Sequence, residues 1–104
     1  LRESAGNGTS VPSAYHLGQN YPNPFNGSTV INFSIVDESR VRLEIYNVLG
    51  EKILTLVDRQ LAPGVHSVSL HGDDMPSGIY LYRLTADLPN GGTHIATKKL
   101  IYLR

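Results

Sequence analysis

The chain contains no cysteine and no tryptophan, and only one methionine among its 104 residues. The absence of cysteine excludes disulfides, thiolate catalysis and cysteine-based zinc sites, and it leaves the cellular compartment open. No apolar run approaches the ~20 residues that a membrane-spanning helix needs, so we expect no membrane insertion. An excess of one charge is also lacking, because nine basic and nine acidic residues cancel. This balance argues against nucleic acid and against an anionic membrane as partners.

The length of the chain fits one domain, which can bury roughly two-thirds of its unfolded surface. The sequence begins at Leu1 without a signal peptide, so we expect it to be a piece of a longer protein. Residues 1–14 have the composition of a flexible linker, and residues 15–104 are predicted to form the domain. After Asp87 the sequence contains no acid, and its charged residues there are Lys98, Lys99 and Arg104.

The segment 19–26, which reads QNYPNPFN and is called the elbow below, separates the polar start of the chain from an alternating pattern. Its two prolines fix their own φ angles and push the preceding residues into extended conformations. We expect its tyrosine and phenylalanine to bury their rings, and its last two asparagines to close Asx-type turns. We interpret the elbow as mainly structural, through Tyr21, Pro22, Asn23, Pro24, Phe25 and Asn26.

From residue 28 onward, apolar and polar side chains alternate in short runs, the pattern of half-buried antiparallel strands. Because the run 51–57 is apolar on both faces, we expect that strand to lie centrally in its sheet. The pattern predicts a short edge strand at 15–17 and further strands at 28–35, 41–46, 51–57, 66–70, 79–84 and 94–103. Three of the turns between them contain Gly50, Gly64 and Gly78.

This series of six or seven strands, at about ten-residue spacing and without a helical period, predicts an all-β fold. We expect an immunoglobulin-like antiparallel β-sandwich of about seven strands, with a small barrel as the competing architecture. The Cys…Trp…Cys signature is absent, so antibody-like topology is not supported. The elbow prolines near one edge, and Lys98 and Lys99 near the other, are suited to protecting exposed strand edges.

Four histidines raise the question of a metal site, but no pair of them has the spacing of two ligands on one helix. We interpret them as surface or rim residues; they are His16, His66, His71 and His94. Asp73 and Asp74, with Asp58 as a third ligand, could supply oxygen atoms to Ca²⁺. We favour the alternative, a solvated turn in which an aspartate caps its own backbone.

No arrangement of residues predicts catalysis. Ser67 and Ser69 lie near histidines, but no strained turn presents either hydroxyl as a nucleophile. Glu44 and Glu51 flank one hairpin and have the pattern of exposed cross-strand charges. We therefore expect no catalytic residue, no metal and no cofactor, and we do not expect the chain to be an enzyme.

Tyr80 and Tyr82 share one face of a predicted strand and could stack on a sugar ring. The competing interpretation places both rings in the core, because the chain has only two phenylalanines. A carbohydrate- or protein-binding accessory module of a secreted enzyme is accordingly the alternative function. A third hypothesis, a structural spacer, predicts that further residues follow Arg104 in the native gene.

Six blocks of sequence follow one another in a characteristic order and spacing. They are LGQNYPNPFN (17–26), STVINF (28–33), VRLEIYNVLG (41–50), LAPG (61–64), SGIYLYRL (77–84) and TKKLIYLR (97–104). In these blocks the chain resembles the C-terminal sorting domain (type A) of the type IX secretion system, which is related to the immunoglobulin-like module of flagellar hook-capping proteins. The chain departs from the family pattern at Gly27, where a proline is common, and at 70–72, which lacks the usual aromatic–acid pair.

The resemblance implies a non-catalytic signal that directs an exported cargo protein through the periplasm and outer membrane of a Gram-negative bacterium. Its implied partners are an N-terminal cargo domain, the outer-membrane translocon and a sortase-like protease. The protease would cut within 1–14, and the cargo would then be joined to lipopolysaccharide at the cell surface or released. A receptor could pair with the final strand by strand addition. The residues implied in translocon recognition are Lys98, Lys99, Leu100, Ile101, Tyr102, Leu103 and Arg104.

Overall fold

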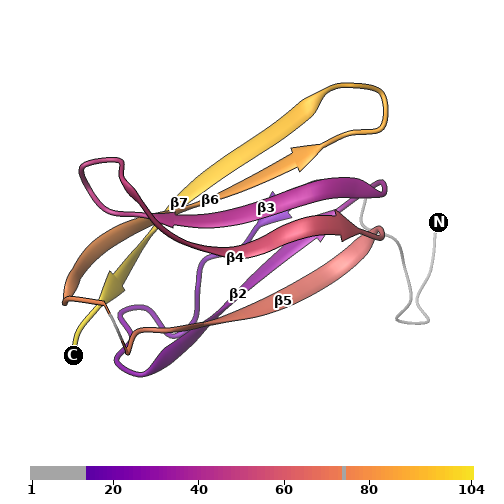
Figure 1. Cartoon of the computed structure of the whole chain (residues 1–104). Coiled ribbons are helices and arrows are strands. Elements are labelled where there is room, and N and C mark those ends of the chain that lie inside the picture. Colours follow the sequence, from indigo (N-terminus) through magenta and orange to yellow (C-terminus); the bar gives the residue numbers. More distant parts are fainter. Residues whose placement is uncertain (1–13, 74) are drawn as a thin grey trace, which may run out of the picture.

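A computed structural model describes residues 14–73 and 75–104 of the chain (Figure 1). The predicted linker 1–14 therefore lies outside the described residues except for Ala14. None of the described residues forms a helix, and hence none forms one that could cross a membrane. The strands within the described ranges are β1 (His16–Leu17), β2 (Ser28–Ile35), β3 (Ser39–Tyr46), β4 (Lys52–Leu61), β5 (Gly64–His71), β6 (Gly78–Asp87) and β7 (Thr93–Tyr102).

The strands form two antiparallel sheets that face each other (Figure 1). The three-stranded sheet has the order β1-β2-β5, and the four-stranded sheet has the order β4-β3-β6-β7. A short connection between β4 and β5 leads from one sheet to the other, so these two edge strands lie on the same side of the sandwich. The predicted all-β sandwich of about seven strands is thereby confirmed.

The core lies between the sheets and follows the period-2 pattern of the sequence. The strand predicted at 28–35 has the bounds of β2, and the run predicted at 41–46 lies within β3. Removing their inward side chains from water supplies a large part of the stabilisation. These side chains are at most 1% exposed, and they are Ile31, Phe33, Ile35, Val41, Leu43 and Ile45.

The strand β4 lies at an edge of its sheet, so the expectation that the run 51–57 is central is wrong. The register of β4 with β3 shifts at two irregularities, which leave Ile53 and Leu56 without a direct partner on β3. Each extra residue of a bulge interrupts the in–out alternation. Apolar residues therefore occupy consecutive positions although only one face of the strand is covered, and Ile53 is 42% exposed.

Glu44 is buried, which corrects its interpretation as an exposed cross-strand charge. Its carboxylate accepts a hydrogen bond from the Tyr46 hydroxyl at 3.0 Å and lies 3.4 Å from Nζ of Lys52. Desolvation, the hydrogen bond to Glu44 and the charge of that carboxylate raise the pKa of Tyr46. Arg83 lies over the Tyr46 ring, 5.1 Å from its centroid. Long side chains thus cover this part of the outer face.

The hairpin between β3 and β4 turns at Gly50, whose φ of 85° lies in the left-handed region that favours glycine. The N–H of Gly50 donates to the carbonyl oxygen of Asn47 at 3.0 Å, which closes the turn. The predicted role of Gly50 in this hairpin is confirmed. Gly64 and Gly78 stand at the first positions of β5 and β6.

Candidate functional site

The elbow crosses from the three-stranded sheet to the four-stranded sheet on the side opposite the β4–β5 connection. Tyr21 forms two backbone hydrogen bonds of 3.0 Å with Val30 of β2. Four residues later the Phe25 N–H donates to the carbonyl oxygen of Ile101 at 3.0 Å. The N–H of Leu103 donates to the carbonyl oxygen of Phe25 at 2.8 Å. The elbow thereby joins β2 to β7 and closes this side of the sandwich.

Two elbow side chains continue the contact with the outer edge of β7. Nε2 of Gln19 donates to the carbonyl oxygen of Lys99 at 2.8 Å, and Oδ1 of Asn23 accepts from the N–H of Ile101 at 2.9 Å. The Asn23 amide therefore bonds to a strand 78 residues away and not to its own turn. Backbone groups between Lys99 and Leu103 are thus already bonded, so strand addition there would require the elbow to be displaced.

The two aromatic rings of the elbow have opposite environments. Phe25 is 2% exposed, and its ring centroid lies 5.0 Å from that of Tyr102. Tyr21 is 81% exposed, so the expectation that both rings are buried is wrong for Tyr21. The pairing with Val30 explains this difference, because directly opposite residues of an antiparallel pair point to the same face, and Val30 is itself exposed.

Asn20 is a buried part of the elbow that sequence reasoning missed, and it is 2% exposed. Its N–H donates to the Tyr82 hydroxyl at 2.9 Å. Its Nδ2 donates to the carbonyl oxygen of Pro22 and to Oγ1 of Thr29, both at 3.1 Å. A buried amide with this many partners holds the start of the elbow in one conformation. The sequence offers no local signal for this role, since an asparagine near a proline also suits an exposed turn.

The seven residues predicted for translocon recognition divide between the core and the surface. Leu100 and Tyr102 are buried, at 0% and 5% exposure, and Lys98 and Ile101 are half-buried. The exposed members are Lys99, Leu103 and Arg104. A partner that meets this folded domain can therefore contact the three exposed side chains. The buried side chains of Leu100 and Tyr102 instead pack β7 against the core.

A groove lies where the elbow meets the end of β7. Its volume is about 400 Å³, and it opens to the surface. The backbone of Arg104 is held in place, because its N–H donates to Oγ of Ser77 at 2.9 Å. The groove is lined by Pro22, Pro24, Phe25, Asn26, Leu103 and Arg104. Its walls thus come from the first and the last of the six sequence blocks.

The chain matches the family described as the secretion system C-terminal sorting domain over residues 19–102. The chain belongs to this family. It is thus a sorting domain of the type IX secretion system, a non-catalytic kind of domain that marks proteins for export to the surface or surroundings of Gram-negative cells. The matched range includes the elbow and all of β7.

One solved structure shows the same architecture. The crystal structure of CopC from Methylosinus trichosporium OB3b superposes with a TM-score of 0.56 at 10% sequence identity. The similarity covers 86% of this chain and 93% of that chain. At such low identity the similarity concerns the β-sandwich fold alone. No curated protein matches the chain.

Tyr80 and Tyr82 of the sorting domain point into the core, at 6% and 0% exposure. The proposed sugar-stacking platform is therefore wrong, and the competing interpretation of these rings is correct. The Tyr82 hydroxyl accepts from Asn20 and donates to the carbonyl oxygen of Gly18 at 2.7 Å. Burial raises the pKa of Tyr82, although the hydrogen bond from Asn20 opposes this shift.

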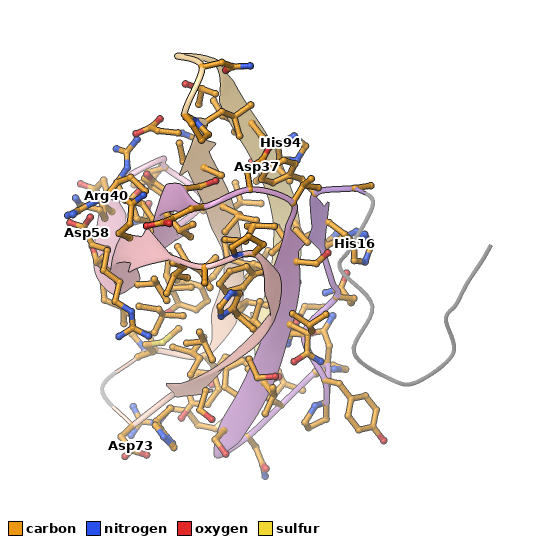
Figure 2. The ribbon with its side chains drawn as sticks, turned by 90° about the vertical axis from the view of Figure 1, so that its right-hand side faces the viewer. His16, Asp37, Arg40, Asp58, Asp73 and His94 are labelled. Carbon is orange, nitrogen blue, oxygen red and sulfur yellow. The ribbon has the colours of Figure 1, made fainter. Side chains whose placement is uncertain are left out.

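The histidines and acids of the sorting domain do not converge. Figure 2 shows His16, Asp58 and Asp73 well apart, with Asp58 beside Arg40. Asp58 pairs with Arg40 at 2.7 Å, and Asp74 lies outside the described residues. Among residues 14–73 and 75–104, no group of three histidines or acids could hold a metal ion.

Two histidines pack their rings against aromatic neighbours. His66 stacks on Phe33 with 5.4 Å between ring centroids, and His94 stacks on Tyr15 at 5.1 Å. Both are half-buried, whereas His16 and His71 are exposed. Ser67 bonds to Oδ1 of the exposed Asn32 and faces solvent. These polar groups therefore stabilise strand pairing and the edges of the core.

Proposed function

We propose that this sorting domain is read by the outer-membrane translocon while it is folded, and that it carries an N-terminal cargo domain through that machinery. The observation that carries the proposal is the family match over 19–102, which covers the elbow and the strands from β2 to β7. A sandwich with two sheets and a closed side is a stiff body. It can present the same surface to a receptor whatever cargo precedes it.

Within this function, residues 98–104 are proposed to be the part that the translocon recognises. Support comes from the edge position of β7 in the four-stranded sheet and from the exposure of Lys99, Leu103 and Arg104. Leu100 and Tyr102 are buried, so their proposed contribution to recognition is indirect. They hold β7 against the core and thereby place the exposed side chains.

Removal of the sorting domain is proposed to follow export, by a sortase-like protease that cuts within residues 1–14. This segment contains three serines, two glycines and one asparagine, and it precedes the first strand in the sequence. A cut there would separate the cargo from an intact sandwich. The cargo would then be joined to lipopolysaccharide or released.

The test is a secreted reporter fused in front of residues 1–104, expressed in a Gram-negative host that has a type IX secretion system. We expect the reporter to reach the medium or cell surface in this host and to stay in the periplasm when the translocon gene is deleted. The reporter without the domain is the control. Export that is independent of the domain or of the translocon would refute the proposed function.

Cleavage is tested in the same cells by mass spectrometry of the exported reporter. A new C-terminus within residues 1–14, absent in a host that lacks the sortase-like protease, is the expected result. An exported reporter that retains the strands of the sandwich would contradict cleavage, while export itself would still support the sorting function.

A further inference from the structure

The elbow and the end of β7 form one continuous surface, although about 80 residues separate them in the sequence. Four hydrogen bonds connect them. Two involve the backbone N–H and carbonyl of Phe25, and the other two involve the side chains of Gln19 and Asn23. The groove of about 400 Å³ lies on this surface. Because both of its walls are held in place, a partner would not have to order them, which lowers the entropic cost of binding.

The walls of the groove are largely apolar. Its lining includes the rings of Pro22 and Pro24 and the side chain of Leu103, which is 51% exposed. Exposed apolar side chains that surround a hollow are typical of surfaces that bind another protein. A volume of this size accommodates at least one large apolar side chain of a partner.

Arg104 is the one charged residue among those that line the groove, although the whole chain is neutral. Residues 14–36, which include the elbow, contain no aspartate, glutamate, lysine or arginine. Residues 88–104 contain three cations and no acid. One of these cations, Arg104, lines the groove, and its planar guanidinium group is suited to a carboxylate.

From these observations we propose that the elbow and the end of β7 form one recognition groove, which binds an extended acidic segment of a translocon protein that inserts an apolar side chain between the prolines and Leu103. The inference rests on the proposed function and adds to it the contact site and the chemistry of the partner. It also replaces strand addition along Lys99–Leu103, because the elbow already bonds to that edge.

The experiment uses the reporter fused to residues 1–104, with two changes in the groove. Asn26→Trp fills the groove with a large ring, and Arg104→Glu reverses its charge. We expect each change to lower export roughly tenfold, which corresponds to about 1.4 kcal/mol of lost binding. Arg104→Lys keeps the charge and is expected to retain most of the export.

Matched controls lie on β4, at the opposite edge of the same sheet. Gln60→Trp introduces the same ring in place of an exposed amide, and Arg59→Glu introduces the same reversal of charge. Both are expected to be exported like the unmodified fusion. Chemical unfolding of each purified variant is compared with that of the unmodified domain. If Asn26→Trp alters folding, Leu103→Glu takes its place, because Leu103 is exposed and its backbone bond to Phe25 is retained.

The outcomes separate the two proposals. If the unmodified fusion is not exported, the proposed function itself fails. If it is exported and the groove variants are exported equally well, the groove is not the recognition site, and the sorting function stands. Equal losses for groove and β4 variants would overturn the assignment to the groove. A loss for Arg104→Lys as large as that for Arg104→Glu would overturn the acidic partner.

Discussion

Replacement of Phe25 by alanine tests whether the elbow is part of the folded core. The ring is 2% exposed and packs against Tyr102 on β7, with 5.0 Å between the ring centroids. The backbone N–H and carbonyl of residue 25, which bond to Ile101 and Leu103, are retained in alanine. The substitution therefore removes the ring and leaves the backbone connection between the elbow and β7 in place.

The expected loss follows from the burial of the ring. Truncation of a buried phenylalanine to alanine costs about 3–5 kcal/mol, because the transfer energy is lost and a cavity remains. The contact with Tyr102 is an aromatic pair, which contributes about 0.5–1.5 kcal/mol beyond its buried area. We therefore expect Phe25→Ala to lower the free energy of unfolding by about 4 kcal/mol.

The assay is equilibrium unfolding of the purified domain in urea. With a slope of about 2 kcal/mol per molar urea, this loss would lower the midpoint by about 2 M. The slope itself should not change, because the surface exposed on unfolding is nearly the same. A loss below about 1 kcal/mol would refute the reasoning, since it would mean that the ring is not packed in the core.

Tyr21→Ala is the matched control, because both residues are aromatic and belong to the same elbow. Tyr21 is 81% exposed, and its backbone bonds to Val30 do not depend on the ring. Exposed substitutions usually change stability by less than about 0.5 kcal/mol. A large loss for Tyr21→Ala would show that the ring has a structural role that its exposure does not indicate.

Two further substitutions test the surroundings of the elbow. Tyr82→Phe should cost about 1–3 kcal/mol in urea unfolding, because the buried N–H of Asn20 and carbonyl of Gly18 lose their partner. Since burial raises the pKa of Tyr82, its ionisation in an absorbance titration should occur above the usual tyrosine range and disappear in Tyr82→Phe. The same shift means that its contribution to stability is complete below the unfolded pKa of about 10 and is lost as the pH rises through the folded value. Gly72→Ala should cost at least about 1–3 kcal/mol, because the added methyl group would overlap the ring of Tyr102.

The prediction for Gly72→Ala has a matched control in the chain. Gly27→Ala adds the same methyl group where no atom lies within 4 Å, so its effect should be much smaller than that of Gly72→Ala. Equal effects of the two glycine substitutions would contradict the packing of Gly72 on Tyr102. A Tyr82→Phe variant as stable as the unmodified domain would show that water or another group satisfies Asn20 and Gly18.

The strands that the sequence predicted best are those with an undisturbed period of two. The run 28–35 has the bounds of β2, because each of its residues pairs directly with a residue of β5. The position of β4 was not predictable in this way. Its two extra residues, Ile53 and Leu56, produce an apolar run that is typical of a central strand, although the strand lies at an edge.

The local sequence pattern also could not predict how exposed the side chains on the outer faces of the sheets are. Glu44 alternates with buried residues, as an exposed charge would, yet Tyr46 and Lys52 cover it. Alternation states which face of the sheet a side chain occupies. It does not state how far neighbours on adjacent strands cover that face, because cross-strand neighbours are distant in the sequence.

The sequence by itself determined an all-β sandwich and, through its six ordered blocks, membership of the type IX sorting domains. Turn residues and two-residue periodicity are local properties, and the blocks are read directly from the order of residues. Only the tertiary structure decided that the elbow bonds to the edge of β7 and that the two enclose a groove. The physical reason is that these contacts join residues about 80 positions apart, and their partners are set by how the two sheets pack together.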